Sequence, residues 1–278
     1  MTPLDLTLAL FGVGVVAGAL GALLGLGGGF ILVPVLTLVF GVNIRLAIGT
    51  SIVAVIATSS GAAVAYLRDH MTNMRVGMFL ELATTTGAVS GAVLGSLLVP
   101  RVLYVIFGLA LAQSGVAVAR RKSLEQRAPP PPDALADRLA LHGTYPDPAR
   151  GRDVSYRVSR TKLGLALMYG AGALSGLLGV GSGVLKVPAM DLAMGLPIKV
   201  SSATSNFMIG VTAAASAGVY FGRHDIDPLI AAPIAVGVLI GALGGSRMLP
   251  GVNPRRLRLL FAVAVLAVAV DMLVKGVT

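Results

Sequence analysis

The chain contains two copies of one apolar pattern, offset from each other by 154 positions. Residues 21–34, GALLGLGGGFILVP, align without a gap with residues 175–188, SGLLGVGSGVLKVP. Over residues 17–107 this alignment gives 27 identities in 91 positions. The identities include proline, tyrosine, histidine and a Pro-Arg pair, which shared apolar composition alone would not place in one register. An internal duplication therefore predicts two structurally equivalent halves.

The apolar segments of both halves predict helices that cross a membrane. Only 12% of the 278 residues are charged and the mean hydropathy is +0.86, whereas soluble domains carry about 25% charged residues. A helix needs about 20 apolar residues to cross a bilayer. We expect apolar segments at about 4–24, 29–41, 45–67, 76–98, 101–119, 163–178, 183–195, 200–221, 229–249 and 257–274. The predicted fold class is an all-α polytopic membrane protein.

A polar segment at residues 120–162 separates the first transmembrane repeat, 1–119, from the second, 163–278. Because four consecutive prolines at 129–132 and mixed charge cannot build a core, we expect a mostly disordered linker with one short helix at 133–141. The linker holds ten Lys or Arg and five Asp or Glu residues. This excess favours the cytoplasmic side of the membrane, and basic cytoplasmic loops are our interpretation of the net charge of +10, without nucleic-acid binding.

Counting crossings outward from the linker places both termini outside the cell. The loop at 68–75 then lies inside, whereas its equivalent at 222–228, GRHDIDP, lies outside. The basic turn at 250–258 lies inside. Equivalent loops thus face opposite sides, which predicts two inverted-topology repeats. Each repeat would consist of a glycine-broken helix pair, or hairpin, and three transmembrane helices.

The two glycine clusters predict helices that are broken inside the membrane. The segments that follow them, 29–41 and 183–195, have 13 residues each, which is about 20 Å of helix against a hydrocarbon core of about 30 Å. A helix that begins at that depth presents N–H groups and its positive dipole end, which suit an anion. We predict that these backbone donors bind the substrate: Gly27, Gly28, Gly29, Gly181, Ser182 and Gly183. Close packing of helices is the alternative, and it is our interpretation of the glycines at 12–25 and 87–96.

Hydroxyl and amide side chains follow each short segment in equivalent positions. They are Thr50 and Ser51 in the first half, and Thr204, Ser205 and Asn206 in the second. Such groups at the start of a helix can donate to an oxyanion, or they can cap the helix itself. The two roles are compatible, so both remain open.

A few charged residues interrupt the apolar segments. Lys186, whose counterpart is Leu32, could neutralise a bound anion, pair with Asp191, or extend to the membrane interface. Glu81 is the candidate for proton or sodium coupling, unless it only reaches the interface. Arg45 and Lys199 occupy equivalent positions and would attract anions to the entrances or anchor their helices at the interface.

The sequence carries no constellation typical of an enzyme. Cysteine is absent, no Walker A motif occurs, and GLGGG is not embedded in a βαβ unit. His70 and His224 lie in loops on opposite faces, so a shared zinc ion is not expected. We therefore expect no catalytic residue, no metal and no cofactor. The first residues, MTPLDLTLALFG, lack a basic region and a cleavage site, and are interpreted as part of a membrane segment.

The motifs GALLGLGGGFILVPVL with GTS, GLLGVGSGVLKVPAM, and SSATSNFMIGVTAAASAG resemble the TauE/SafE sulfite exporter family, also called the toluene sulfonate uptake permease (TSUP) family. The resemblance covers residues 8–119 and 163–274 and implies a bacterial or archaeal plasma (inner) membrane permease. It implies small sulfur-containing anions as substrates: sulfite, thiosulfate, sulfoacetate and organosulfonates. Two features depart from the pattern, namely Gly-Ser-Gly in the second cluster and Lys186 where the family leads us to expect an apolar residue.

The leading hypothesis is a secondary transporter that exposes an anion site alternately to the two sides of the membrane. The alternatives are an anion channel of the same fold, a transporter of small organic carboxylates, and a membrane scaffold whose glycines only pack. The expected partners are a small anion, the lipid bilayer and a proton or sodium ion, with no nucleic acid. The glycine-rich faces would also allow a homodimer.

Overall fold

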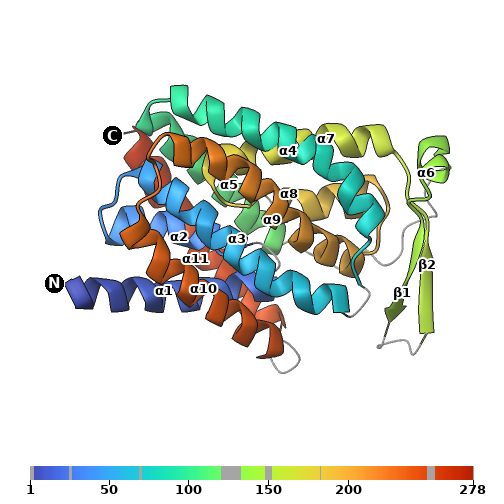
Figure 1. Ribbon diagram of the computed structural model, residues 1–278, viewed down its shortest axis with the longest axis horizontal. Coiled ribbons are helices and arrows are strands. Elements are labelled where there is room, and N and C mark those ends of the chain that lie inside the picture. Colours follow the sequence, from blue (N-terminus) through green and yellow to red (C-terminus); the bar gives the residue numbers. More distant parts are fainter. Residues whose placement is uncertain are drawn as a thin grey trace.

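Long helices make up most of the molecule. The computed structural model describes residues 3–24, 27–68, 71–119, 133–147, 152–181, 183–248 and 254–277. It is 81% helical, and Figure 1 shows the helices packed side by side in one bundle, with a small helix and a hairpin at one end. The first residues of α1 and the last of α11 lie at the opposite end of the bundle (Figure 1).

The same order of elements occurs in both halves. The first half contains α1 (Pro3–Leu24), α2 (Gly29–Pro34), the π-helical η1 (Val35–Val39), α3 (Ile44–Arg68), α4 (Met74–Leu97) and α5 (Pro100–Ala119). The second contains α7 (Thr161–Leu178), α8 (Gly183–Pro188), the π-helical η2 (Ala189–Ala193), α9 (Ile198–Gly222), α10 (Pro228–Met248) and α11 (Pro254–Val277). Every predicted segment has its helix, with ends that differ by a few residues. In the described part, α1, α3, α4, α7 and α10 are long and apolar enough to cross a membrane.

Proline shapes the two short helices. Pro34 and Pro188 end their α-helical turns, because proline has no N–H to donate and its ring crowds the preceding turn. The backbone then widens to π-helical bonding. Phe40 N–H donates to the Val35 carbonyl at 3.3 Å, and its equivalent Met194 donates to Ala189 at 3.2 Å. The equivalent prolines thus produce the same local geometry twice.

Glycines let two pairs of long helices approach to backbone contact. A Cβ atom on Gly91 of α4 would collide with the Ala173 carbonyl of α7, and one on Gly245 of α10 would lie 2.8 Å from the Ala19 carbonyl of α1. The two contacts are equivalent in the repeat, because Gly245 is 154 positions after Gly91 and Ala173 is 154 positions after Ala19. The packing interpretation of the glycines at 12–25 and 87–96 is therefore confirmed where α1 and α4 meet their partners.

We predict that Gly91→Val destabilises the protein by about 1–3 kcal/mol, because the new side chain forces α4 and α7 apart. Gly12→Val is the control, since nothing lies within 4 Å of a Cβ atom at Gly12. The chain has no tryptophan and no cysteine, so thermal unfolding in detergent is best followed by far-UV circular dichroism. Equal unfolding temperatures for the two variants would contradict this account of the packing.

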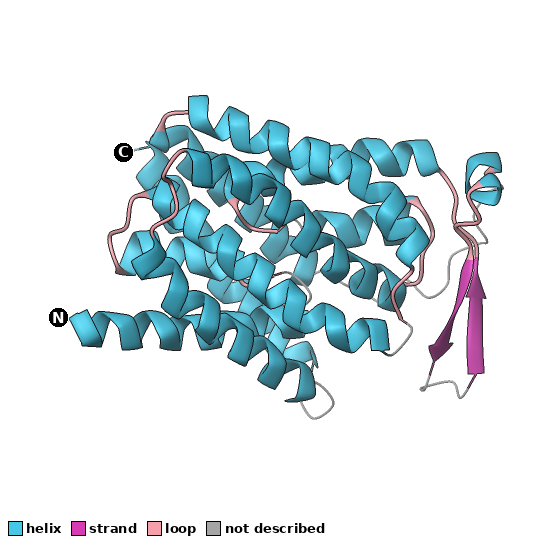
Figure 2. Ribbon diagram, in the orientation of Figure 1, coloured by secondary structure: helices cyan, strands magenta, loops and turns pink. Residues whose placement is uncertain are grey.

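Between the two halves lies a small unit, which comprises α6 (Ala134–Arg138), β1 (Gly143–Asp147) and β2 (Arg152–Tyr156). The strands pair antiparallel, with Gly143 opposite Tyr156, and Figure 2 shows them beyond the end of the bundle. The sequence predicts a mostly disordered linker here; the structure instead has a hairpin, together with a short helix inside the predicted range 133–141. The prolines at 129–132 lie outside the described residues.

The loop before α4 fastens this unit to the bundle. The Asn73 amide donates to the Leu141 carbonyl at 3.0 Å and to the Tyr156 hydroxyl at 2.7 Å. From the other side of the unit, Ser159 N–H donates to the Met194 carbonyl, which follows η2. Tertiary contacts hold the ends of the hairpin, and Tyr145, Val154 and Tyr156 pack against the hydrophobic core.

Asp133 joins α6 to the start of α7. Its carboxylate accepts hydrogen bonds from the N–H groups of Leu135 and Ala136, and from both the N–H and the hydroxyl of Thr161 at 2.7 and 2.9 Å. The bonds from Thr161 favour the ionised form and hold the pKa of Asp133 below its ordinary value. The stabilisation is therefore complete above the ordinary pKa of aspartate, and is lost as the pH falls through the lowered value.

We predict that Asp133→Asn weakens the docking of α6 by about 1 kcal/mol, because an amide still caps α6 but cannot also accept from Thr161. Hydrogen exchange measured by mass spectrometry should show faster exchange at the starts of α6 and α7. Acidification through the lowered pKa of Asp133 should give the same change in the wild type, after correction for intrinsic rates. Asp153→Asn, at an exposed site on β2, is the control, and equal protection in both variants would refute the role of Asp133.

Candidate anion site

The two glycine breaks lie against each other inside the bundle. A Cβ atom on Gly29 would lie 2.7 Å from the Gly179 carbonyl oxygen, and one on Gly27 would lie 3.7 Å from the Val180 carbonyl oxygen. The structure therefore brings together the two segments that the sequence predicts to form one site. Three residues of these segments, Gly25, Leu26 and the predicted donor Ser182, lie outside the described residues.

Val55 on α3 and Ile209 on α9 are buried and pack against both breaks. A Cβ atom on Gly181 would lie 2.8 Å from Val55 Cγ1 and 3.0 Å from Ile209 Cγ2. Gly27 and Gly181 also have φ angles of +72° and +69°, a conformation that glycine adopts without strain. At Gly181, glycine is therefore required by the backbone and by the lack of space.

One of the predicted backbone donors, the Gly183 N–H, is already used within the chain. The Gly183 N–H donates to the Gly181 carbonyl, and the Gly28 carbonyl accepts from the N–H groups of Ile31 and Leu32 at the start of α2. The second break is thus folded onto itself in this arrangement. An anion would have to displace the Gly183–Gly181 bond to use that donor.

Ser51 connects the two breaks. Its hydroxyl donates to the Gly179 carbonyl at 2.5 Å and lies 3.5 Å from the Gly29 carbonyl. The equivalent Ser205 is fully buried, but its hydroxyl has no hydrogen-bond partner among the described residues. Ser205 lies one helical turn before Ile209, on the same face of α9, so its hydroxyl is on the side of the helix that meets the breaks.

Two further predicted residues are buried without a partner in the described part of the chain. They are Thr50, through its hydroxyl, and Asn206, through its amide nitrogen. A buried donor without a partner costs about 1–3 kcal/mol, so native proteins pair nearly all such groups with protein, water or ligand. Three unpartnered donors, one in α3 and two consecutive in α9, favour a site for a polar guest.

The sequence interpretation of these residues as helix caps is wrong. Thr50 and Thr204 lie about two turns inside α3 and α9, because the helices begin at Ile44 and Ile198. Asn43 occupies the position before α3, and its side chain accepts from Arg45 N–H at 2.9 Å. The hydroxyl and amide groups at 50–51 and 204–206 therefore lie within the bundle.

Thr204 differs from its equivalent Thr50 because it has a partner. Its hydroxyl accepts a hydrogen bond from Asn73 N–H at 3.0 Å. Asn73 is the residue whose side chain holds the small unit between the halves. A predicted site residue is therefore one hydrogen bond away from that unit.

A buried hydrogen-bonded chain of charged and hydroxyl groups crosses from α8 to α4. Lys186 is fully buried, and its ammonium donates to the Thr212 hydroxyl at 2.6 Å. The Thr212 oxygen lies 2.6 Å from Glu81 Oε1, which also accepts from the Thr85 hydroxyl at 3.0 Å. The other carboxylate oxygen, Oε2, is buried without a partner among the described residues.

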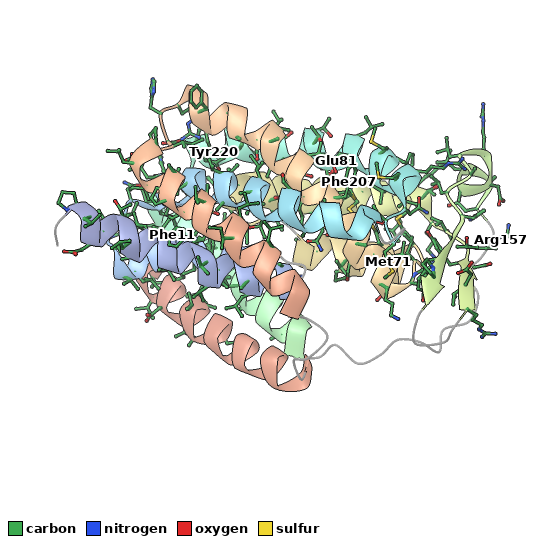
Figure 3. All side chains as sticks on the ribbon, turned by 60° about the horizontal axis from the view of Figure 1, so that its bottom comes forward. Phe11, Met71, Glu81, Arg157, Phe207 and Tyr220 are labelled. Carbon is green, nitrogen blue, oxygen red and sulfur yellow. The ribbon has the colours of Figure 1, made fainter. Side chains whose placement is uncertain are left out.

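This hydrogen-bonded chain excludes one of the roles left open for the two charged residues. Lys186 does not extend to an interface, and Glu81 is only 7% exposed, so neither serves as an interface anchor. Figure 3 shows Glu81 within the bundle, far from Arg157 on the hairpin. Sequence reasoning missed Thr212 and Thr85, although Thr212 aligns with Thr58 in the repeat.

The positions equivalent to this hydrogen-bonded chain carry no charge. Leu32 stands for Lys186 and Thr58 for Thr212, while Ala235 in α10 stands for Glu81. The Thr58 hydroxyl simply donates to the Ala54 carbonyl of its own helix at 2.8 Å. The charged chain is therefore an addition to one side of a symmetric framework.

Arg45, one of the two predicted entrance residues, is bound at the end of α4. Its guanidinium donates to the Leu98 carbonyl at 3.0 Å. This contact agrees with an anchoring role. Lys199 is partly buried in the first turn of α9.

Apolar helices around two broken helices and a buried polar centre define a multi-pass membrane protein of the transporter class. The family described as Sulfite exporter TauE/SafE matches residues 10–272. The chain therefore belongs to the TauE/SafE family, and the resemblance seen in the motifs is confirmed.

Relatives of the chain are named as probable membrane transporter proteins. The chain is 26% identical over 271 residues to the probable membrane transporter protein YunE of Bacillus subtilis (strain 168). The alignment covers 95% of this chain and 96% of that protein. The chain is 30% identical over 261 residues to a probable membrane transporter protein of Xylella fastidiosa (strain 9a5c), covering 92% and 90%. A probable membrane transporter protein of Methanocaldococcus jannaschii, MJ0441, is 23% identical over 267 residues, covering 90% and 89%. No solved structure matches significantly.

Proposed function

We propose that this protein is a secondary transporter of small sulfur-containing oxyanions, such as sulfite, thiosulfate or organosulfonates. The observation that carries the proposal is the meeting of two glycine breaks beside buried donors that have no partner in the described chain. The substrate class follows the name of the family, Sulfite exporter TauE/SafE. The chain contributes donors of a kind that suits an oxyanion.

The anion would bind between the breaks. The Ser205 hydroxyl, together with Thr50 and Asn206 nearby, would donate to its oxygens, and the start of α2 at Gly29 would contribute its positive dipole end. Lys186, one turn after Gly183, would supply a full positive charge. The present packing of Val55 and Ile209 against Gly27 and Gly181 corresponds to a closed arrangement, from which the breaks must separate to admit the anion.

Alternating access would use the two halves as inverted repeats. Contacts between α1 and α10 join Phe11 to Gly237 and Val15 to Gly241, so these helices run parallel. An inverted repeat requires that equivalent helices, such as α1 and α7, run in opposite directions. The parallel pairing of α1 with α10, the equivalent of α4, is compatible with that arrangement. In the proposed orientation the small unit is cytoplasmic and both chain ends are outside, in agreement with their positions at opposite ends of the bundle (Figure 1).

Binding is tested by thermal shift on the purified protein with matched anion pairs. Sulfoacetate and malonate differ in one sulfonate, as do taurine and β-alanine, and sulfite and thiosulfate complete the series. We expect the sulfur oxyanions to raise the unfolding temperature, because a ligand at about 100 times its Kd stabilises by about 2.7 kcal/mol. A response to malonate but not to sulfoacetate would favour a carboxylate transporter, and no response to any anion would contradict the proposal.

Transport is tested by counterflow of thiosulfate in proteoliposomes. A carrier accumulates labelled substrate against unlabelled substrate trapped inside, whereas an open channel only equilibrates it. Accumulation is the expected result. Equilibration without accumulation would favour an anion channel of the same fold.

A further inference from the structure

The chain Lys186–Thr212–Glu81 places one positive and one negative group in the same buried site. We propose that it couples transport to protons: Glu81 balances Lys186 when no substrate is bound, and takes up one proton when an anion replaces it as the partner of Lys186. The inference rests on the proposed anion transport. It adds that the anion and a proton move in the same direction.

The geometry provides both requirements of such an exchange. The Thr212 hydroxyl lies between the two charged groups. Its oxygen is 2.6 Å from Lys186 Nζ and 2.6 Å from Glu81 Oε1. Thr212 is thus a positioning residue whose oxygen holds the ammonium and the carboxylate at a fixed separation. Lys186 lies one turn from Gly183 of the second break, and Thr212 lies one turn from Ile209, which packs against both breaks. An anion that separates the breaks therefore arrives beside the ammonium.

The proton has a defined destination. Glu81 Oε1 accepts from Thr212 and Thr85, whereas Oε2 is buried without a partner in the described residues. A proton that enters from the aqueous side from which the anion arrives would bind to Oε2. The site then contains Lys186, the anion and a neutral carboxylic acid, so the charge of the Glu81 carboxylate is no longer added to that of the anion.

Other ionisable groups stand on the elements packed around Glu81. They are Arg75 on α4, Lys162 and Tyr169 on α7, Asp191 on η2, and Lys199 and Tyr220 on α9. Arg75 donates to Ala140, Tyr169 to Ser90, and Tyr220 to Gly176 and Leu177. Lys186 is the charged group that the described hydrogen bonds connect to Glu81, so this pair carries the proposed exchange.

The experiment measures two signals from the full chain in proteoliposomes. Thiosulfate counterflow reports anion transport, and a trapped pH indicator reports protons that enter with thiosulfate while the membrane potential is clamped. Thiosulfate is suitable because its own charge does not change near neutral pH. We expect counterflow and internal acidification in the wild type, and an apparent Kd for thiosulfate that falls by up to about tenfold for each unit of decreasing pH.

Variants separate the coupling from the transport. Glu81→Gln should retain counterflow but lose acidification and the pH dependence of the Kd, whereas Glu81→Asp should restore both. Lys162→Gln, an exposed site on α7, is the control and should behave as the wild type. If Glu81→Gln does not fold, the wild-type measurements and Glu81→Asp still decide the question.

Each outcome has one meaning. Counterflow without acidification in the wild type overturns the coupling and leaves the proposed function intact. Acidification that persists in Glu81→Gln shows that another group carries the proton and overturns the role of Glu81. The absence of counterflow for every anion refutes the proposed function, and the coupling with it.

Discussion

Lys186→Leu is expected to destabilise the protein by about 3–5 kcal/mol, because it leaves the Glu81 carboxylate buried without its counter-charge. The substitution introduces the residue that stands at the equivalent position of the first half, Leu32, so the shape of the site should tolerate it. The variant should also lose anion-dependent stabilisation. Far-UV circular dichroism with denaturant, with and without thiosulfate, measures both effects.

The sequence supplies a matched control for this prediction. The double variant Glu81→Ala with Lys186→Leu introduces the uncharged residues that stand at the two equivalent positions, Ala235 and Leu32. It should recover much of the lost stability, because no unpaired charge remains. It should still fail to bind thiosulfate. A Lys186→Leu variant as stable as the wild type would show that the two charges do not depend on each other.

Gly29→Ala is expected to abolish transport and to destabilise the protein by about 1–3 kcal/mol. The added methyl group would lie 2.6 Å from Val55 Cγ2 and 2.7 Å from both the Gly179 carbonyl oxygen and the Ser51 hydroxyl. The two breaks would have to separate permanently, which removes the closed arrangement required for alternating access. Thiosulfate counterflow and thermal unfolding measure the two effects.

Two further variants control the Gly29→Ala result. Gly170→Ala, on the exposed side of α7 with nothing within 4 Å of its Cβ position, should be neutral or stabilising by up to about 1 kcal/mol, since alanine favours helix. Val55→Ala in the Gly29→Ala background removes the nearest contact and should restore part of the stability. Full transport by Gly29→Ala alone would show that the breaks do not need their close approach.

The helices and the two breaks follow from local features of the sequence. Apolar segments delimit helices because the cost of exposing polar backbone to lipid is high, and the duplication implies that one break has an equivalent in the other half. The prolines after both clusters explain why the segments remain short. These features depend on neighbouring residues, so a single sequence reveals them.

Other features depend on contacts between distant residues. The bond from Thr212 to Glu81 joins residues 131 positions apart, and no local pattern indicates that α4 and α9 pack side by side. Similarly, the hairpin of β1 and β2 forms against Asn73 and Met194, which lie far away in the sequence. For Thr50 and Ser51, capping is one of two roles that the sequence leaves open, because a polar residue after a short segment commonly marks a helix start; the helix in fact begins earlier, at Ile44.

The central claim is that the two glycine breaks together form the anion site. Its most direct test is the position of selenite, an analogue of sulfite, located by anomalous scattering in crystals of the full chain. The account predicts one selenium peak between residues 27–29 and 181–183, within hydrogen-bond reach of Ser205. A peak elsewhere in the bundle, with the breaks still packed against Val55 and Ile209, would contradict it.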